Sequence, residues 1–205
     1  ARKAGIAVGE YEISLQGEIA LRDKIGPYEF EISANSFFQT NTAGAELLYR
    51  TVGEYAGLTG EERVVDLYSG TGTIGIWLSS HAGEVIGIEI VDSAVNDALK
   101  NCRRNRITNC RFIQGDIIDC LPQIRSNPDV LIIDPPRAGM HKKVVNLELD
   151  MSPPRIVYVS CNPGTLARDL GMMKDRYHVL EVQPVDMFPH THHIESVTRL
   201  ERKQS

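Results

Sequence analysis

The sequence predicts an α/β fold built on a seven-stranded, mostly parallel sheet, and three observations lead to this prediction. From about residue 62 onward, short apolar runs alternate with amphipathic stretches, the pattern of a parallel sheet covered by helices. A glycine-rich turn follows the first of these runs and opens a helix. The last two runs lie too close together for a helix between them, so we expect them to be antiparallel to each other.

The apolar runs give the expected strands and the amphipathic stretches the expected helices. Strands are expected at residues 63–68, 84–89, 111–114, 129–134, 155–160, 178–184 and 196–202. Helices are expected at residues 43–56, 73–80, 93–105, 141–149 and 164–174.

The first 32 residues differ from the rest of the chain. Short antiparallel strands are expected at residues 11–15, 18–21 and 28–32, around turns at Gln16-Gly17 and Gly26-Pro27. We interpret residues 1–32 as the tail of a preceding β-rich subdomain and residues 33–205 as one α/β domain. Because Ala1 begins in mid-pattern, we expect the chain to be a fragment of a longer protein.

Composition excludes several classes of protein. Hydrophobic residues make up 42% of the 205 residues and charged residues 24%, values that are ordinary for a globular protein. No apolar stretch is long enough to span a membrane, and the N-terminus lacks the architecture of a signal peptide, so the cytoplasm is expected by default. The four cysteines lack the spacing of a zinc or iron–sulfur site, so no metal is expected in this segment.

The formal net charge of −5 bears on the choice of partner. A protein that binds RNA by itself usually carries an excess of basic residues that neutralise phosphates. The acidic balance leaves two interpretations open. Either the substrate is not a nucleic acid, or the positive charge is local or lies in a domain outside this chain.

The glycine-rich turn predicts a nucleotide site. Gly70, Gly72 and Gly75 form a GxGxxG pattern between a strand and a helix, where small residues let the backbone approach a ligand and the helix offers free N–H groups. Glu89 closes the next strand, where a carboxylate can accept hydrogen bonds from both ribose hydroxyls. The pattern therefore predicts a bound adenosine nucleoside rather than only a tight turn.

NAD and S-adenosylmethionine (SAM) both contain adenosine, and two features favour SAM. Asp66 lies in the strand just before the glycines, where its carboxylate suits the amino-acid end of SAM but would repel the pyrophosphate of NAD. The fourth strand ends in Asp134-Pro-Pro-Arg-Ala-Gly139, a rigid turn at the carboxyl edge of the sheet, where open α/β folds bind ligands.

Cys161 follows the strand at 155–160 and emerges at the same edge as Asp134. A cysteine in this place can act as a thiolate nucleophile if the electropositive start of the following helix lowers its pKa. The other cysteines lie on or beside helices and strands without such neighbours and are interpreted as core residues: Cys102, Cys110 and Cys120.

Five motifs occur in order along the chain. They are Ser33-Ala-Asn-Ser-Phe-Phe-Gln39-Thr-Asn, Asp66-Leu-Tyr-Ser-Gly-Thr-Gly, Asp134-Pro-Pro-Arg-Ala-Gly, Ser160-Cys-Asn-Pro and His190-Thr-His-His-Ile-Glu-Ser196. Together they closely resemble the RNA uracil-5-methyltransferase family, over roughly residues 27–202. The resemblance implies a Rossmann-like, SAM-dependent methyltransferase fold, SAM as cofactor, and a tRNA or rRNA as the partner.

The resemblance also implies roles for particular residues. Cys161 matches the family's nucleophile, which adds to carbon 6 of uracil, and Glu195 matches the base that removes the carbon-5 proton. Asp116 is implied to lie near the adenine. Residues expected to bind the cofactor, from the resemblance or from the glycine-rich turn, are Gln39, Tyr68, Gly70, Gly72, Thr73, Glu89 and Asp134.

Other residues of the motifs carry weaker expectations. Arg137 is a candidate for contact with a phosphate or with the base carbonyl. Without the resemblance, Glu195 would be interpreted as a solvated carboxylate. We expect Phe37-Phe38 to pack in the core, and we interpret the histidines as residues that shape a loop: His190, His192 and His193.

Members of this family usually carry an N-terminal OB-like RNA-binding domain, and some carry an iron–sulfur cluster; neither is recognised in this chain. We therefore expect an RNA-binding domain elsewhere in the same protein. Three alternatives stay open: a methyltransferase acting on cytosine carbon 5 or an exocyclic amine, a non-catalytic RNA-binding or RNA-folding module, and, last, an NAD-dependent dehydrogenase.

Overall fold

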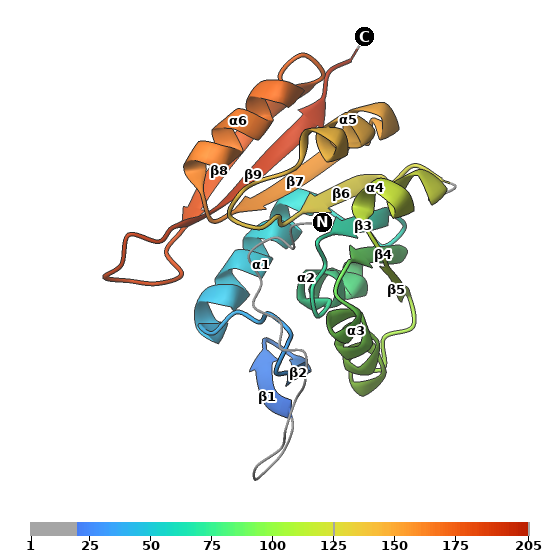
Figure 1. Cartoon of the computed structure of the whole chain (residues 1–205), viewed down its shortest axis with the longest axis vertical. Coiled ribbons are helices and arrows are strands. Elements are labelled where there is room, and N and C mark those ends of the chain that lie inside the picture. The colour runs from blue at the N-terminus through green and yellow to red at the C-terminus, as the bar shows by residue number, and fades with distance from the viewer. Residues whose placement is uncertain (1–19, 125, 205) are drawn as a thin grey trace.

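The computed structural model describes residues 20–124 and 126–204, and its centre is a seven-stranded sheet (Figure 1). The strands are β3 (Arg63–Leu67), β4 (Glu84–Glu89), β5 (Cys110–Gln114), β6 (Val130–Ile133), β7 (Arg155–Ser160), β8 (Tyr177–Val185) and β9 (Glu195–Arg202). Their order is β5-β4-β3-β6-β7-β9-β8, and β9 runs antiparallel to both of its neighbours while β5, β4, β3, β6 and β7 pair in parallel. The predicted fold class is therefore confirmed.

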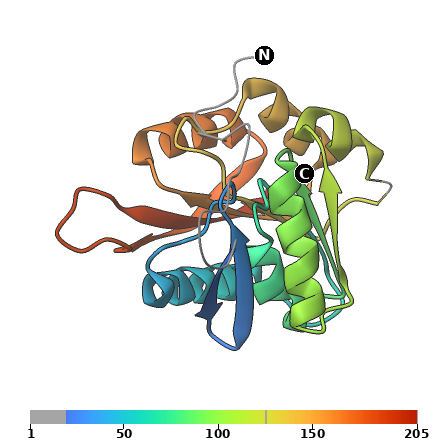
Figure 2. The same ribbon diagram turned by 60° about the horizontal axis from the view of Figure 1, so that its bottom comes forward.

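Helices cover both faces of the sheet, as Figure 2 shows. They are α1 (Thr42–Ala56), α2 (Thr73–Leu78), α3 (Asp92–Arg104), α4 (Ile117–Cys120), α5 (Lys142–Met151) and α6 (Pro163–Met173). One apolar cluster joins the sheet to α1, α2 and α3, and a second joins it to α4, α5 and α6. Because the central strands are buried on both faces, their sequences are mainly apolar, and Asp66 of β3 is an exception. Among the described residues, no helix is both long and apolar enough to cross a membrane.

A small hairpin precedes the sheet and differs in part from the expectation. Strands β1 (Ala20–Ile25) and β2 (Tyr28–Ser33) pair antiparallel around a turn at Gly26-Pro27. The strand expected at 28–32 is confirmed. The strand expected at 18–21 is wrong in extent, since β1 continues to Ile25. Residues 21–24 are exposed and three of them are charged, so the sequence does not show the alternation of a half-buried strand. The strand expected at 11–15 lies outside the described residues.

Side chains of α3 hold the free edge of this hairpin. Two residues of the helix and its C-cap, spaced four residues apart, bond the backbone of alternate β2 residues: Asp97 to Ser33, Asn101 to Glu31, and the cap Asn105 to Glu29. The Glu31 N–H donates to Asn101 Oδ1 over 2.7 Å, and Asn101 Nδ2 donates back to the Glu31 carbonyl. The unpaired edge of β2 is thereby satisfied. The segment between β2 and α1 is anchored at its start beside the carboxyl edge of the sheet.

Candidate active site

The turn between β3 and α2 contains glycines that serve different purposes. Gly70 has φ +52°, and a Cβ there would meet nothing within 4 Å, so its surface stays open to a ligand. Gly72 has φ +78°, and a Cβ there would lie 2.6 Å from the ring of Phe112 and 3.0 Å from Ala98. Gly72 therefore lets the loop pack against β5 and α3, and of the two glycines only Gly70 faces the open space.

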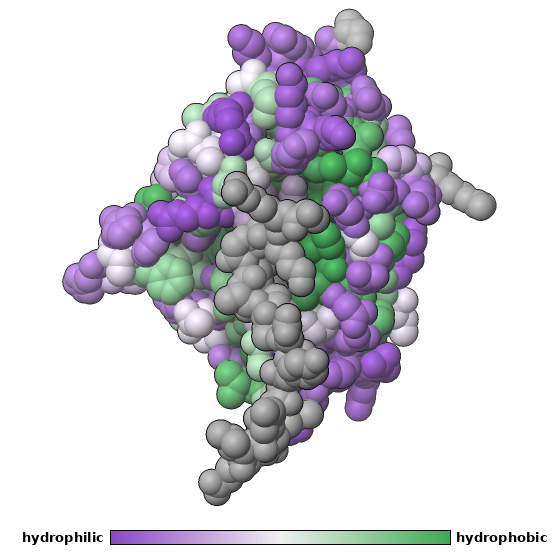
Figure 3. Space-filling view, in the orientation of Figure 1, coloured by the Kyte–Doolittle hydropathy of each residue, from purple (hydrophilic) through white to green (hydrophobic). Residues whose placement is uncertain are grey.

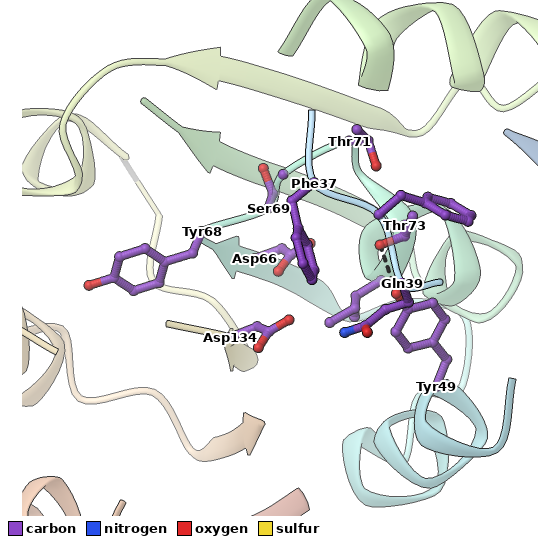
Figure 4. A pocket seen from close by; sticks show the side chains of 12 residues that line it. Phe37, Gln39, Tyr49, Asp66, Tyr68, Ser69, Thr71, Thr73 and Asp134 are labelled. Carbon is purple, nitrogen blue, oxygen red and sulfur yellow. Dashed lines mark hydrogen bonds between the residues drawn. The ribbon is translucent and has the colours of Figure 1, made fainter. Parts of the chain in front are cut away.

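A pocket lies at the carboxyl ends of β3 and β6, shown in Figure 4. The carboxylates of Asp66 and Asp134 and the amide of Gln39 face one space, while the ring of Tyr68 points away from it. The Tyr49 hydroxyl donates a hydrogen bond to the Thr73 hydroxyl at 3.0 Å. The lining residues are Phe37, Phe38, Gln39, Tyr49, Asp66, Tyr68, Ser69, Gly70, Thr71, Thr73, Ile74 and Asp134.

Several buried polar atoms of this pocket lack a partner among the described residues. They are both carboxylate oxygens of Asp66, the Ser69 hydroxyl and the Thr71 hydroxyl. Leaving a buried donor or acceptor unsatisfied costs about 1–3 kcal/mol each, so such atoms call for an explanation. They line the pocket, so its wall is polar and acidic and suits a polar ligand that carries positive charge, as SAM does.

The two pocket carboxylates are difficult to ionise in the absence of a cation. Burial raises the pKa of Asp66 well above its usual value, and the neighbouring Asp134 adds to the effect. Burial, with a contribution from Glu195, raises the pKa of Asp134 to about 7. A cation held between these carboxylates would favour their ionised forms and so bind more tightly as the pH rises.

Replacing Asp134 with asparagine is expected to stabilise the ligand-free chain at pH 8 by about 2 kcal/mol, and by less at pH 5. The folded carboxyl keeps its proton up to pH about 7, whereas the unfolded one releases it near pH 4, so folding binds a proton in this window. Stability of the natural sequence therefore falls as the pH rises from about 4 to 7, and the D134N substitution removes part of that fall. Urea denaturation of the D134N variant and of the natural sequence at pH 5 and pH 8 measures this difference in the free energy of unfolding.

The control for this prediction is Asp150→Asn, at an exposed carboxylate of α5. This control is expected to leave the difference in stability between pH 5 and pH 8 unchanged. A D134N variant with the same pH dependence as the natural sequence would show that Asp134 is not held protonated in the fold.

Two further predicted cofactor residues lie at the same sheet edge but do not line this pocket. Glu89 accepts hydrogen bonds from the Gly70 N–H at 3.0 Å and from the Val91 N–H at 2.8 Å, which fixes its carboxylate beside the glycine loop. Asp116 is exposed and caps α4 by accepting from the Ile118 N–H at 2.8 Å. A ligand would therefore have to extend from the pocket along the ends of β4 and β5 to reach both.

A second group of side chains lies at the ends of β7 and β9. The register pairs Ser160 with Ser196, and the Ser196 hydroxyl donates to the Ser160 carbonyl at 3.3 Å. Cys161 directly follows Ser160, and Glu195 directly precedes Ser196 on the antiparallel strand. The sheet therefore brings together two positions that are 34 residues apart in the sequence. Glu195 is only 9% exposed, so the interpretation as a solvated carboxylate is wrong.

The electrostatics of this pair differ from the sequence-based expectation. The pKa of the Cys161 thiol is raised, not lowered, first because of burial and then because of the carboxyls of Glu195 and Asp134; Arg137 opposes the shift. Burial raises the pKa of Glu195 to about 7, again opposed by Arg137. Loss of solvent and like-charged neighbours both disfavour the charged form of an acidic group. A carboxyl with a pKa near neutrality is suited to proton transfer.

The loop that carries Arg137 is held by the first half of α6. Arg168 Nη2 donates to the carbonyls of Ala138 and Met140, each at 3.1 Å. Asp169 is fully buried and accepts from the Met140 N–H at 2.9 Å. Because α6 starts two residues after Cys161, these bonds fix the loop relative to the cysteine. No local pattern indicated this role, since an Arg-Asp pair on a helix usually lies in solvent.

The expectation for the two phenylalanines is half right. Phe38 packs on Phe30, with ring centroids 5.6 Å apart, and belongs to the core. Phe37 is 73% exposed at the pocket, because neighbouring residues of this segment point to opposite sides. His193 stacks on His192 at a centroid distance of 4.4 Å and contacts the Arg137 guanidinium at 3.3 Å. Within the described part of the chain, no group of three or more His, Cys, Asp or Glu side chains could hold a metal ion.

Comparison with known proteins identifies the family of the chain. The model of the tRNA (uracil-5-)-methyltransferase family matches residues 2–117 and 123–203. The chain belongs to this family. It is 50% identical over 190 residues to an uncharacterized RNA methyltransferase of Bacteroides thetaiotaomicron, covering 91% of this chain and 42% of that relative. It is 44% identical over 206 residues to one from Nitratidesulfovibrio vulgaris, covering 97% of this chain and 44% of that relative.

A solved structure of a uracil-5 methyltransferase confirms the fold. The crystal structure of Pyrococcus abyssi tRNA (uracil-54, C5)-methyltransferase in complex with S-adenosyl-L-homocysteine is similar with a TM-score of 0.80 at 35% identity. The match covers 94% of this chain and 48% of that protein. This chain thus spans less than half the length of these members of the tRNA (uracil-5-)-methyltransferase family.

Proposed function

We propose that this chain is the catalytic part of an enzyme that transfers a methyl group from SAM to carbon 5 of a uridine in tRNA or rRNA. The observation that carries the proposal is the pair Cys161 and Glu195, which directly adjoin the paired residues Ser160 of β7 and Ser196 of β9 at the same sheet edge as the pocket. A thiol and a carboxyl with a pKa of about 7 are the groups that addition to uracil and removal of a proton require.

The pocket fits SAM better than NAD. The carboxylates of Asp66, which is buried, and Asp134, which is half-buried, suit a cationic ligand and would repel a pyrophosphate. Gln39 supplies an amide at the same space, and Glu89 and Asp116 would receive the ribose and the adenine further along the edge. When bound, SAM supplies the methyl group as an electrophile on a sulfonium.

In this mechanism Cys161 makes carbon 5 of uracil electron-rich. The thiolate forms a bond to carbon 6, and the electron pair of the carbon 5–carbon 6 double bond moves into the ring carbonyl as an enolate. Carbon 5 then takes the methyl group and still carries its hydrogen. Because Cys161 lies at a half-buried strand end, the uridine must leave its base stack to reach it.

Glu195 completes the reaction. Its carboxylate removes the carbon-5 proton, the electron pair restores the double bond, and the thiolate of Cys161 leaves. Arg137 lies close enough to lower the pKa of both groups, and we assign it to the substrate as a contact for a phosphate or for the base carbonyl. We further propose that residues 1–32 end a preceding subdomain and that a separate RNA-binding domain selects the target.

Calorimetric titration of SAM and of NAD into the chain tests the cofactor. SAM is expected to bind saturably and NAD not at all. Glu89→Ala removes a carboxylate that is held beside Gly70, and it should weaken SAM binding by at least about tenfold. Glu54→Ala, at an exposed carboxylate of α1, should not. A folded chain that binds NAD, or that binds SAM equally well without Glu89, would contradict the assignment of the site.

A further inference from the structure

The acidic net charge of −5 raises the question of how this chain holds an RNA strand. Ten of the nineteen basic side chains of the described part already lie in ion pairs with carboxylates, and we expect these to contribute less. Those in ion pairs are Arg22, Lys24, Arg50, Arg63, Lys100, Arg104, Arg111, Arg155, Arg168 and Arg199.

The basic side chains without an ion pair, among residues 20–124 and 126–204, fall into three places. Two lie at or just after the end of α3, four lie at the amino edge of the sheet beside β8 and β9, and three lie at the carboxyl edge. They are Arg103 and Arg106; Lys174, Arg176, Arg202 and Lys203; and Arg137, Lys142 and Lys143.

The third group, Arg137, Lys142 and Lys143, forms what we call the basic rim. All three side chains are exposed, and they lie on the loop and first helical turn that follow Asp134. Arg137 acts electrostatically on both Cys161 and Glu195, and the two lysines follow it by five and six residues at the start of α5, at the carboxyl edge of the sheet. In the view of Figure 3, hydrophilic side chains cover the top of the molecule, where α5 and α6 lie, and hydrophobic ones show to the right of the centre.

Carboxylates around the rim do not cancel its charge. Glu148 of α5, Asp169 of α6 and Glu195 of β9 are buried, and Asp134 on the same loop is half-buried. Helix α4, which packs against α5, carries the exposed Asp119 and is capped by the exposed Asp116. The exposed carboxylates nearest along the chain are Asp129, just before β6, and Asp150, at the other end of α5. None of the exposed carboxylates of the described residues forms an ion pair with a rim cation. The charge of the rim is therefore directed to solvent.

The position of the two lysines argues against a role in stability. Lys142 and Lys143 occupy the first turn of α5, which contains no acidic residue. Positive charge at a helix N-terminus opposes the helix dipole and is unfavourable for the helix. The lysines thus cost the helix stability, whereas a negatively charged ligand would benefit from them.

We propose that the basic rim binds the phosphates of the RNA strand that flanks the target uridine. The inference rests on the proposed function, since it takes RNA as the substrate. A base that enters the site at Cys161 and Glu195 leaves its own sugar–phosphate backbone outside, at the rim of the pocket. A single strand opened around one base presents its phosphates there, and exposed lysines and arginines recognise them without regard to sequence.

The test compares two variants that remove the same charge from opposite edges of the sheet. One is Lys142→Gln/Lys143→Gln, and its matched control is Lys174→Gln/Arg176→Gln. Affinity for a fluorescein-labelled oligouridylate of about 12 nucleotides is measured by fluorescence anisotropy between about 50 and 300 mM salt. For single strands each lost phosphate contact reduces the salt slope of log K by about 0.7, so the rim variant should lose about 1.4 in slope and about 25-fold in affinity at about 0.1 M salt.

The control variant should keep the slope and affinity of the natural sequence, and the rim variant should unfold at the same or a higher temperature. Equal losses in both variants, an unchanged slope in the rim variant, or no binding of the oligonucleotide by the natural sequence would each overturn the inference. Titration of SAM separates it from the proposed function. If the chain bound the oligonucleotide through the rim but bound no SAM, the inference about the rim would stand and the proposed function would be contradicted.

Discussion

Replacing Cys161 with alanine is expected to reduce methyl transfer by at least about 10³-fold while leaving the affinity for SAM nearly unchanged. The thiol forms the bond to carbon 6 in the proposed mechanism, and no other described cysteine can replace it, since Cys102 and Cys120 are buried and Cys110 lies on β5. The side chain does not line the cofactor pocket, so binding of SAM should not depend on it. Transfer of tritium from methyl-labelled SAM to undermodified bulk tRNA and rRNA measures the activity.

A matched control keeps this experiment specific for position 161. Cys120→Ala removes a thiol from α4 and should retain activity. Undiminished activity of the C161A variant would exclude covalent catalysis and favour an acceptor that needs no nucleophile, such as an exocyclic amine. A C161A variant that loses SAM affinity as well would indicate that the substitution disturbs the sheet edge.

The raised pKa of Cys161 adds a pH dependence to this prediction. Burial and the carboxyls of Glu195 and Asp134 disfavour the thiolate in the ligand-free chain. Uracil addition requires the thiolate, so the rate of adduct formation should increase as the pH rises through neutrality and above. Bound phosphates are negatively charged and would not favour the thiolate. Among the described residues, Arg137 is the cation that lowers the pKa of the Cys161 thiol.

The sheet and its helices could be predicted because local sequence determines them. Strands such as β6, Val130–Ile133, are buried on both faces and carry only apolar residues, which is a strong local signal. The signal of strand β1 is weak, because most of its side chains are charged or exposed and its pairing depends on β2. Helix α4 was missed because Ile117–Cys120 is too short to show a helical period.

The candidate site was predictable in position but not in its electrostatics. Strand ends and turn residues placed Gly70, Asp134 and Cys161 at one edge of the sheet, because parallel strands share their carboxyl edge. The pKa values of Cys161 and Glu195 depend on burial and on partners far apart in the sequence. The anchoring of the 134–140 loop by Arg168 depends on how α6 docks, which no local pattern encodes.

Replacing Glu195 with glutamine is expected to arrest the reaction after methyl transfer, with turnover reduced by at least about 10²-fold. Glutamine has nearly the same volume as the buried glutamate, so the fold of β9 should persist. The amide cannot accept the carbon-5 proton, so the double bond does not re-form and Cys161 stays attached to the methylated base. Glu181→Gln, at an exposed carboxylate of β8, is the control and should turn over normally.

The accumulated adduct distinguishes this role from a structural one. Under denaturing conditions the E195Q variant should migrate as a protein–RNA conjugate that carries the methyl label, and the amount should approach one RNA per chain. Adding Cys161→Ala to E195Q should abolish the conjugate, because the bond runs through the thiol. A structural defect would instead lower turnover without any conjugate. An E195Q variant that turns over normally would show that another group removes the proton, and the pKa of about 7 at Glu195 would then need a different explanation.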